Sequence, residues 1–352
     1  MLRPCGNYKK SYPEDAAIFQ TRFTKVCMAL FFLMLILLPF LLRPYQLHFI
    51  NMLGIFVLGA LGMNILTGFT GVISIGQGVF VGLGAYATAI LMIKFKMHFL
   101  LAFPLGAVVT AFLSLIPGVS CLRIKGIYLL MPTLAAHVAF NFVIIETASL
   151  TGGDMGLSLP KSFVTSVEGF HKYYFFLIFS LVVVLTLFAR NLLRTKIGRI
   201  FIAIRDNDLA AEVLGISVGK YRLVAFWLSS FYAGLAGGLW AGYVGVVSVE
   251  QFGIDLSIMF LAIILIGGMG SVMGSILGTV FMLMIPEILS VLAIATKGML
   301  GTGMSHSFQI INNGIFGLLI IVFLIYEPLG LAKIWWKIRS YWKLWPFSYT
   351  GV

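Results

Sequence analysis

Long apolar runs without a single charged side chain recur along this chain and constrain its fold more than any other feature. The longest covers residues 44–93, and another covers residues 256–286. Of the 352 residues, 60% are hydrophobic and 10% are charged, whereas about a quarter of the residues in a soluble domain are charged. Because this composition cannot cover a soluble globule with polar surface, we exclude soluble enzymes, secreted modules and nucleic-acid-binding proteins. We expect an integral membrane protein.

The uncharged runs predict an all-α, polytopic bundle of about ten spans, since one span needs about 20 mainly apolar residues. The predicted spans are residues 26–42, 47–66, 79–93, 99–121, 127–145, 173–189, 223–243, 256–268, 272–296 and 309–326. The spans 79–93 and 256–268 are short because glycine clusters divide the runs that contain them. Each either crosses the membrane fully or is a re-entrant or broken helix.

The distribution of Lys and Arg predicts that both chain ends lie in the cytoplasm. With this orientation the inner segments hold 18 of the 24 basic residues. Multi-pass proteins concentrate basic residues on the cytoplasmic side, so the net charge of +12 needs no nucleic-acid partner. We predict a cytoplasmic segment over 1–25, a transmembrane domain over 26–326 and a cytoplasmic tail over 327–352. Trp, Tyr and basic residues alternate in the tail, which favours an interfacial helix over a disordered tail.

Uncharged polar side chains cluster at two places inside the apolar regions. The first group is Asn64, Thr67, Ser74, Gln77 and Tyr86, with Gly71 among the glycines between them, and the second is Thr133, His137 and Asn141. The second group recurs every four residues and therefore lies along one face of a helix, which should face the bundle interior or a cavity. Both groups are candidates to line a translocation path. The alternative for the first group is close helix packing at its glycines, which explains Asn64 and Gln77 less well, and the alternative for the second is interhelical hydrogen bonding.

The sequence offers little to an enzyme or an ion-coupled transporter. Charged residues are nearly absent inside the predicted spans, whereas ion-coupled transporters keep ionisable groups near the midplane. The five histidines are scattered, and the three cysteines show neither paired nor metal-type spacing. We therefore predict no catalytic residue and no metal site, and an ion-coupled secondary transporter is kept only as a distant alternative.

The most informative cytoplasmic segment is residues 190–222, which joins two predicted spans. Leu209, Val213 and Ile216 recur at helical spacing, and Gly215 stands where a helix would end. The pattern predicts a short amphipathic helix that projects into the cytoplasm and docks on a partner. A solvated basic loop would not need such regular apolar spacing.

The run from Arg205 to Gly215 resembles the variant EAA loop of bacterial ABC-importer permeases, and most closely that of permeases for branched-chain amino acids. Four further blocks agree with this family in the same order: Asn64 to Tyr86, Leu150 to Leu157, Ser248 to Glu287 with its Gly267–Ser271 core, and Tyr326 to Leu331. The chain departs from the family where Ala136 and His137 follow Thr133-Leu134-Ala135, which leaves the exact substrate open.

The resemblance implies a permease subunit of a bacterial inner membrane that moves branched-chain or related amino acids inward by alternating access. Its implied partners are a second permease subunit, two cytoplasmic ATPases and a periplasmic solute-binding protein, besides the amino acid and membrane lipid. The chain has no G-x-x-x-x-G-K-[ST] loop to bind phosphates, so ATP would be hydrolysed by the partners and no cofactor is expected here. A permease for urea or short amides is the alternative within the family.

The resemblance also assigns contacts to particular residues. Contact with the ATPase is implied for Arg199, Arg205, Asp206, Asn207, Leu209, Ala210, Ala211, Glu212, Val213, Gly215 and Ile216. The loop that contains Thr151, Gly152 and Gly153 would face the binding protein.

Overall fold

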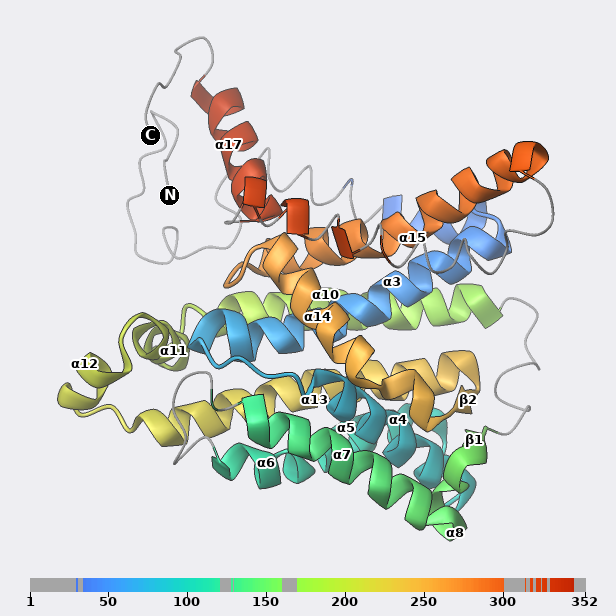
Figure 1. Cartoon of the computed structure of the whole chain (residues 1–352), viewed down its shortest axis with the longest axis horizontal. Helices are drawn as coiled ribbons and strands as arrows, with labels where there is room; N and C mark the ends of the chain where they lie inside the picture. Colours follow the sequence, from blue (N-terminus) through green and yellow to red (C-terminus); the bar gives the residue numbers. More distant parts are fainter. Residues whose placement is uncertain are drawn as a thin grey trace.

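Long helices lie side by side in the computed structural model of this chain (Figure 1). The structure describes residues 30, 34–120, 128, 130–159, 170–300, 314, 317–318, 321–323, 325–327 and 330–344. The predicted segment 1–25 and the end of the tail lie outside these residues, and the predicted spans 26–42 and 309–326 are described only in part.

Each of the other eight predicted spans coincides with a helix. The α-helices are α3 (Pro44–Met63), α4 (Gln77–Ile93), α5 (Phe99–Leu113), α6 (Leu115–Val119), α7 (Leu130–Glu146), α8 (Ala148–Thr151), α10 (Phe170–Leu192), α11 (Lys196–Asp206), α12 (Asp208–Val213), α13 (Val218–Val244), α14 (Ile254–Gly267), α15 (Val272–Leu300) and α17 (Leu331–Leu344). Shorter elements are the π-helix η1 (Asn64–Phe69), the 3₁₀ turns η4 (Gly153–Met155) and η5 (Val249–Phe252), and the antiparallel strands β1 (Leu157–Ser158) and β2 (Val246–Val247).

The all-α membrane fold is confirmed for the part of the chain that the structure describes. Five helical stretches there are long and apolar enough to cross a membrane, and α7 with its bent continuation makes a sixth. The helix α4 and residues 272–288 of α15 are apolar but shorter. A total of about ten spans stays a prediction.

The glycine clusters divide the long apolar runs as expected. In the first run, α3 passes into the π-helix η1, the chain is irregular from Gly71 to Gly76, and α4 starts at Gln77. In the second run, the turn Gly268–Ser271 separates α14 from α15. Each break exposes backbone polar groups that the side chains described below satisfy, because an unsatisfied buried peptide group is costly.

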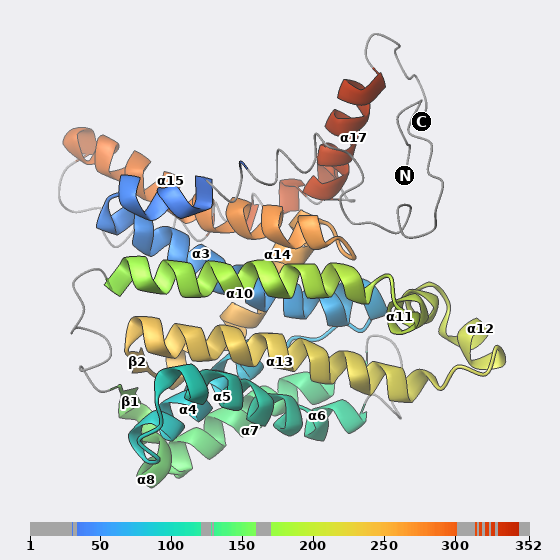
Figure 2. The ribbon, with the colours of Figure 1, turned by 180° about the vertical axis from the view of Figure 1, so that it is seen from behind.

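The centre of the bundle is the packing of α13 on α3, α4 and α5 (Figure 2). Glycines bring the backbones of these helices into direct contact. A Cβ atom added at Gly84 would lie 2.4 Å from the carbonyl oxygen of Gly234, and one at Gly237 would lie 1.9 Å from that of Val81. Contacts of this kind are the usual way in which small residues join membrane helices.

The connecting segments separate into two ends of the bundle, as the alternation of predicted inner and outer segments requires. At one end, which we call the α12 end, lie α11, α12, Gly71 and the turn Gly268–Ser271. At the other end, the β end, lie β1, β2 and α8 (Figure 1). The side of the membrane that each end faces stays a prediction.

Candidate functional site

Two short helices, α11 and α12, make the predicted docking segment at the α12 end. The Thr195 hydroxyl accepts a hydrogen bond from the Gly198 amide at the start of α11. Asn207 has extended backbone angles between the helices, and its side chain accepts a hydrogen bond from the Ala210 amide at 3.0 Å. These are the N-caps that Thr and Asn favour. Gly215 then turns the chain away with φ +82°, which confirms the turn expected there.

The apolar ridge of this segment differs from the predicted one by one residue. Leu209, Val213 and Leu214 are 63%, 88% and 79% exposed. Ile216 is not part of the ridge, because it packs inward against a small core of Ile200, Ile204, Ala211 and Val218. The turn at Gly215 breaks the helical spacing, so Leu214 takes the outward position that periodicity assigned to Ile216. Ala211 is buried in the same core, whereas Ala210, Glu212 and Arg199 are exposed.

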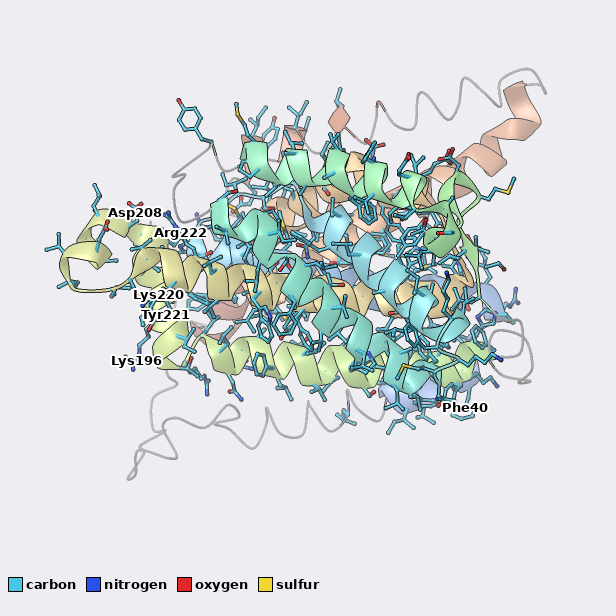
Figure 3. All side chains as sticks on the ribbon, turned by 90° about the horizontal axis from the view of Figure 1, so that it is seen from below. Phe40, Lys196, Asp208, Lys220, Tyr221 and Arg222 are labelled. Atoms are coloured by element: carbon cyan, nitrogen blue, oxygen red, sulfur yellow. The ribbon has the colours of Figure 1, made fainter. Side chains whose placement is uncertain are left out.

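Charged side chains of both signs surround the joint between α11 and α12. Figure 3 shows Lys196, Lys220 and Arg222 together with Asp208 at this end of the bundle, with Phe40 at the opposite end. Arg222 donates to the Asp208 carboxylate at 3.1 Å, and the Nε atom of Arg205 lies 3.4 Å from Asp206.

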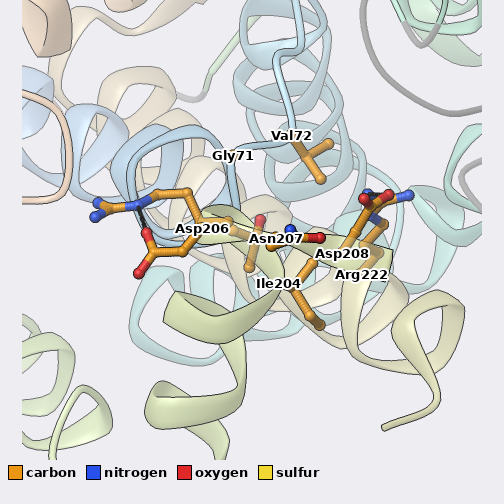
Figure 4. Close-up of a pocket in the computed structure, with 9 residues that line it drawn as sticks. Gly71, Val72, Ile204, Asp206, Asn207, Asp208 and Arg222 are labelled. Atoms are coloured by element: carbon orange, nitrogen blue, oxygen red, sulfur yellow. Dashed lines mark hydrogen bonds and ion pairs between the residues drawn. The ribbon is translucent and has the colours of Figure 1, made fainter. Parts of the chain in front are cut away.

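A hollow of about 390 Å³ lies between these two ion pairs, beside the backbone of Gly71 and Val72 (Figure 4). Ile204, Asn207 and Asp208 line it as well. The joint between the helices is therefore open and polar, whereas the ridge on α12 is apolar.

Two of the nine predicted path residues bond helices together. Gln77 donates to the Gly59 carbonyl of α3 at 2.8 Å and accepts from the Ser229 hydroxyl of α13 at 3.3 Å. Asn64 likewise uses both ends of its amide, on Gly270 and Ser271 of the α14–α15 turn. Both side chains are 1% exposed. The interpretation as interhelical hydrogen bonding therefore describes these two residues in this conformation.

Three more of these residues make hydrogen bonds to the irregular segment between η1 and α4, and Gly71 lies within it. The Thr67 hydroxyl donates to the Val72 carbonyl at 3.1 Å, and the Ser74 hydroxyl accepts from the Gly76 amide at 3.1 Å. The Thr133 hydroxyl accepts a hydrogen bond from the Ile75 amide at 3.2 Å, so α7 also binds the segment between η1 and α4. Gly71 lies in the segment with φ +71° and is exposed at the α12 end.

The remaining three path residues are Tyr86 on α4 and His137 and Asn141 on α7. Within the described residues, the Tyr86 hydroxyl and the Asn141 carbonyl oxygen have no hydrogen-bond partner, and the His137 ring lies near the backbone of Gly253. Tyr86 and His137 are 2% and 1% exposed, and the Tyr86 ring contacts Phe140 edge-on at 6.2 Å. Because nearly all buried polar atoms in proteins are hydrogen-bonded, the Tyr86 hydroxyl and the Asn141 oxygen need a partner such as water or a polar solute. The predicted inward face of α7 is confirmed for Thr133 and His137.

The glycine-rich loop at the β end is an ordered turn. Thr151 donates to the Ile144 carbonyl at 2.6 Å and ends α8, while Gly152 and Gly153 have φ values of +74° and +58°. Met155 beyond them is 95% exposed. The loop then enters β1, which pairs with β2 after α13.

One polar cluster at the β end did not emerge from the sequence. The ring nitrogens Nδ1 of His48 and His171 each lie 3.0 Å from the hydroxyl of Tyr243. Asn51 donates to the backbone carbonyl of His171, and Phe170 stacks on Tyr243 at 6.0 Å. The sequence held a signal for this cluster, because His48, His171 and Tyr243 lie close to the predicted outer ends of three different spans. The two histidines are not accompanied by a third acidic, Cys or His ligand among the described residues.

Comparison with known proteins decides the family. A family model described as "Branched-chain amino acid transport system / permease component" matches residues 45–324. The chain belongs to this permease family. The permease is 31% identical over 276 residues to the high-affinity branched-chain amino acid transport system permease protein LivM of Salmonella typhimurium, and 30% identical to that of Escherichia coli. Each alignment covers 71% of the permease and 65% of the relative, so the permease spans about two thirds of the length of these relatives.

Two further relatives are also similar to the permease, and one of them is named for a different solute. The autoinducer 2 import system permease protein LsrC of Enterobacter sp. is 30% identical over 226 residues, covering 62% of the permease and 63% of the relative. The probable branched-chain amino acid transport permease protein LivH of Methanocaldococcus jannaschii is 27% identical, covering 80% and 89%. No solved structure matches. The family resemblance and the membrane transport class predicted from the sequence are thus confirmed.

Proposed function

We propose that this chain is the membrane-spanning subunit of an ABC importer that moves branched-chain amino acids inward by alternating access. Two partner ATPases supply the energy, and a periplasmic solute-binding protein delivers the substrate. The observation that carries the proposal is the exposed ridge of Leu209, Val213 and Leu214 on a short helix beyond the end of the bundle. Three exposed large apolar side chains beside the polar joint of α11 and α12 are suited to burial in a groove of a partner.

The substrate class is supported by the family and by the chemistry between α4 and α7. The unpaired Tyr86 hydroxyl and Asn141 carbonyl oxygen are a neutral donor and a neutral acceptor. Phe140 and Phe252 lie close to Gly82 nearby, so aromatic and polar surfaces are adjacent. An amino acid with an aliphatic side chain needs both kinds of surface, and alternating access needs hydrogen-bonding sites that bind it weakly enough to release it.

Further surfaces are proposed for the other partners. The turn of Thr151, Gly152 and Gly153 at the β end would face the binding protein in the periplasm. The α12 end would then lie in the bacterial cytoplasm, and the bundle between the two ends would cross the inner membrane. The apolar outer faces of α5 and α7 are exposed over most of their length and would contact lipid or the second permease, which we propose is a different chain. The chain itself would hydrolyse no ATP and bind no nucleic acid.

The test is reconstitution in proteoliposomes with the second permease, the ATPases and the binding protein. We expect leucine-loaded binding protein to stimulate ATP hydrolysis, and labelled leucine, isoleucine or valine to accumulate inside. No stimulation by any loaded binding protein would contradict the proposal.

A different substrate is the second candidate, because the LsrC protein of similar sequence is named as an autoinducer 2 import permease. The same vesicles offered urea, short amides or autoinducer 2 distinguish these cases. If one of these compounds inhibits the uptake of labelled leucine and valine does not, that compound is the better candidate for the substrate.

A further inference from the structure

The guanidinium of Arg205 lies in a socket made of backbone from two distant parts of the chain. Its Nη1 atom donates to the carbonyl of Gly68 in η1 at 3.0 Å, although the residues are 137 positions apart. A Cβ atom at Gly270 would lie 2.5 Å from the same Nη1, and one at Gly71 would lie 3.1 Å from Cγ of Arg205. We call Gly68, Gly71 and Gly270 the Arg205 socket. The φ values of +71° at Gly71 and +80° at Gly270 favour glycine, and a side chain at either position would also have to share space with the arginine.

The socket joins η1 to the turn between α14 and α15. Asn64, at the first position of η1, donates to the Ser271 carbonyl at 2.9 Å and accepts from the Gly270 amide at 2.9 Å. A Cβ atom at Gly68 would lie 1.8 Å from the Asn64 side-chain oxygen, so these groups are in direct contact. A displacement of Arg205 therefore acts on η1 and on the turn together.

The contact also has a clear electrostatic basis. Gly68 lies one residue before the end of η1, where carbonyl groups lack partners within the helix. The negative end of the helix dipole favours a cation, and a hydrogen bond from a charged donor is stronger than one from a neutral donor. Arg205 thus caps the C-terminus of a π-helix, a form that is rare and frequent at functional sites.

We propose that Arg205 is a positioning residue that transmits movement of α11 and α12 to α3 and to the α14–α15 turn through its socket. The proposal rests on the proposed function, since it needs a partner that moves α12. Arg205 is three residues before Asp208, where α12 begins, so a shift of α12 moves the guanidinium. The element with two arrangements is η1, which the cap stabilises as a π-helix in this conformation.

The test uses the complete reconstituted complex and measures amino acid transported per ATP hydrolysed. Arg205→Gln is expected to lower this ratio roughly fivefold or more, the lower end of typical coupling between sites. Arg205→Lys keeps a cation for the Gly68 carbonyl and is expected to restore most of the loss. Lys196→Gln removes a positive charge from the same helix without touching the socket, and serves as the matched control.

A double-mutant cycle tests the shared route. Asn64→Ala is expected to lower the ratio as Arg205→Gln does, and the two together are expected to lose no more than one alone, because coupled sites are not additive. Multiplying losses would show independent roles and overturn the proposal. An unchanged ratio in Arg205→Gln would also overturn the proposal. So would a reduced recovery of the ATPases with this variant, because Arg205 would then be a docking residue.

A second measurement does not depend on the substrate. Hydrogen exchange at residues 66–70 is expected to quicken in Arg205→Gln and not in Lys196→Gln, because the cap of η1 is lost. Unchanged exchange would overturn the proposal even in a complex that transports nothing, whereas failure of the wild-type complex to respond to loaded binding protein would contradict only the proposed function.

Discussion

The carboxylate of Asp208 lies 3.1 Å from the guanidinium of Arg222, and this ion pair joins α12 to the start of α13. Arg222 keeps only 11% of its side chain exposed, and its Nε atom has no partner among the described residues. Asp208→Ala leaves this guanidinium buried without a counter-charge, which we expect to cost about 1–3 kcal/mol.

The loss is expected as a lower unfolding temperature in detergent and faster hydrogen exchange in α12. Asp208→Ala combined with Arg222→Met removes both charges and should recover part of the stability. An equal loss in the single and double variants would show that the pair does not stabilise the joint.

Replacement of the ridge residue Leu214 by Asp is expected to weaken ATPase docking without unfolding the permease. The side chain is 79% exposed, so its packing in the free permease is small, whereas burial of a large apolar side chain in a partner contributes about 1.5–3 kcal/mol. Recovery of ATPase subunits with the tagged permease should fall about tenfold or more. Phe95→Asp is the control, because Phe95 is 69% exposed at the other end of the molecule. Equal recovery of ATPase subunits with the wild type, Leu214→Asp and Phe95→Asp would contradict the docking assignment.

The turn at Gly215 gives a sharper pair of variants. A Cβ atom there would have nothing within 4 Å, so the only cost of a side chain is the backbone angle φ of +82°. Gly215→Asn should be tolerated, because Asn adopts left-handed angles readily, whereas Gly215→Val should shift α12 and reduce ATPase stimulation. Identical stimulation in the two variants would show that the direction of the turn is unimportant.

Among the predicted path residues, Tyr86 and Gln77 should respond in opposite ways. Tyr86→Phe removes a hydroxyl that has no partner in the described part of the chain, so stability should be kept and uptake should fall. Gln77→Leu breaks bonds to α3 and α13 and should cost about 1–2 kcal/mol of stability. Asn141→Leu should resemble Tyr86→Phe. Thermal unfolding and leucine uptake, measured side by side, check this, and a stability loss in Tyr86→Phe would contradict the path assignment.

Impermeant thiol reagents test the orientation of the two ends. Met155 at the β end and Leu214 at the α12 end are both highly exposed, so Met155→Cys and Leu214→Cys place a thiol at each end. In a background with Cys5, Cys27 and Cys121 replaced by Ser, we expect Met155→Cys to react in intact cells and Leu214→Cys only after the membrane is opened. Reaction of both in intact cells would contradict the topology. Lys161, a natural marker of the same outer loop, lies outside the described residues.

Much of the fold could be predicted because apolar length and charge placement are properties of the chain alone. Eight predicted spans coincide with helices, and Gly71 and Gly268–Ser271 interrupt the runs in which glycine clusters were visible. The site could be predicted only in part. Helical spacing assumes that a helix continues, and it therefore assigned Ile216 to a ridge from which the turn at Gly215 removes it.

Other features depend on residues that only the fold brings together. Asn64 and Gln77 are polar residues of the kind that can line a path, and only the fold supplies the groups that they bond: backbone groups of α3 and of the α14–α15 turn, and the Ser229 hydroxyl of α13. The contact of Arg205 with Gly68 is another case, because no local pattern links an arginine after one span to a glycine 137 residues earlier. The cluster of His48, His171 and Tyr243 required three spans to be aligned at one level.

The backbone contact of Gly84 with Gly234, and of Gly237 with Val81, has a mechanical consequence. Helices that touch without intervening side chains have no flexible layer that can yield between them, so we expect α4 and α13 to move as one stiff block. The proposed alternating access would then be a motion of other elements against this block. Thr133 on α7 instead reaches the segment before α4 through a side-chain hydrogen bond with the Ile75 amide. We expect a second conformation of the permease to break or exchange this bond.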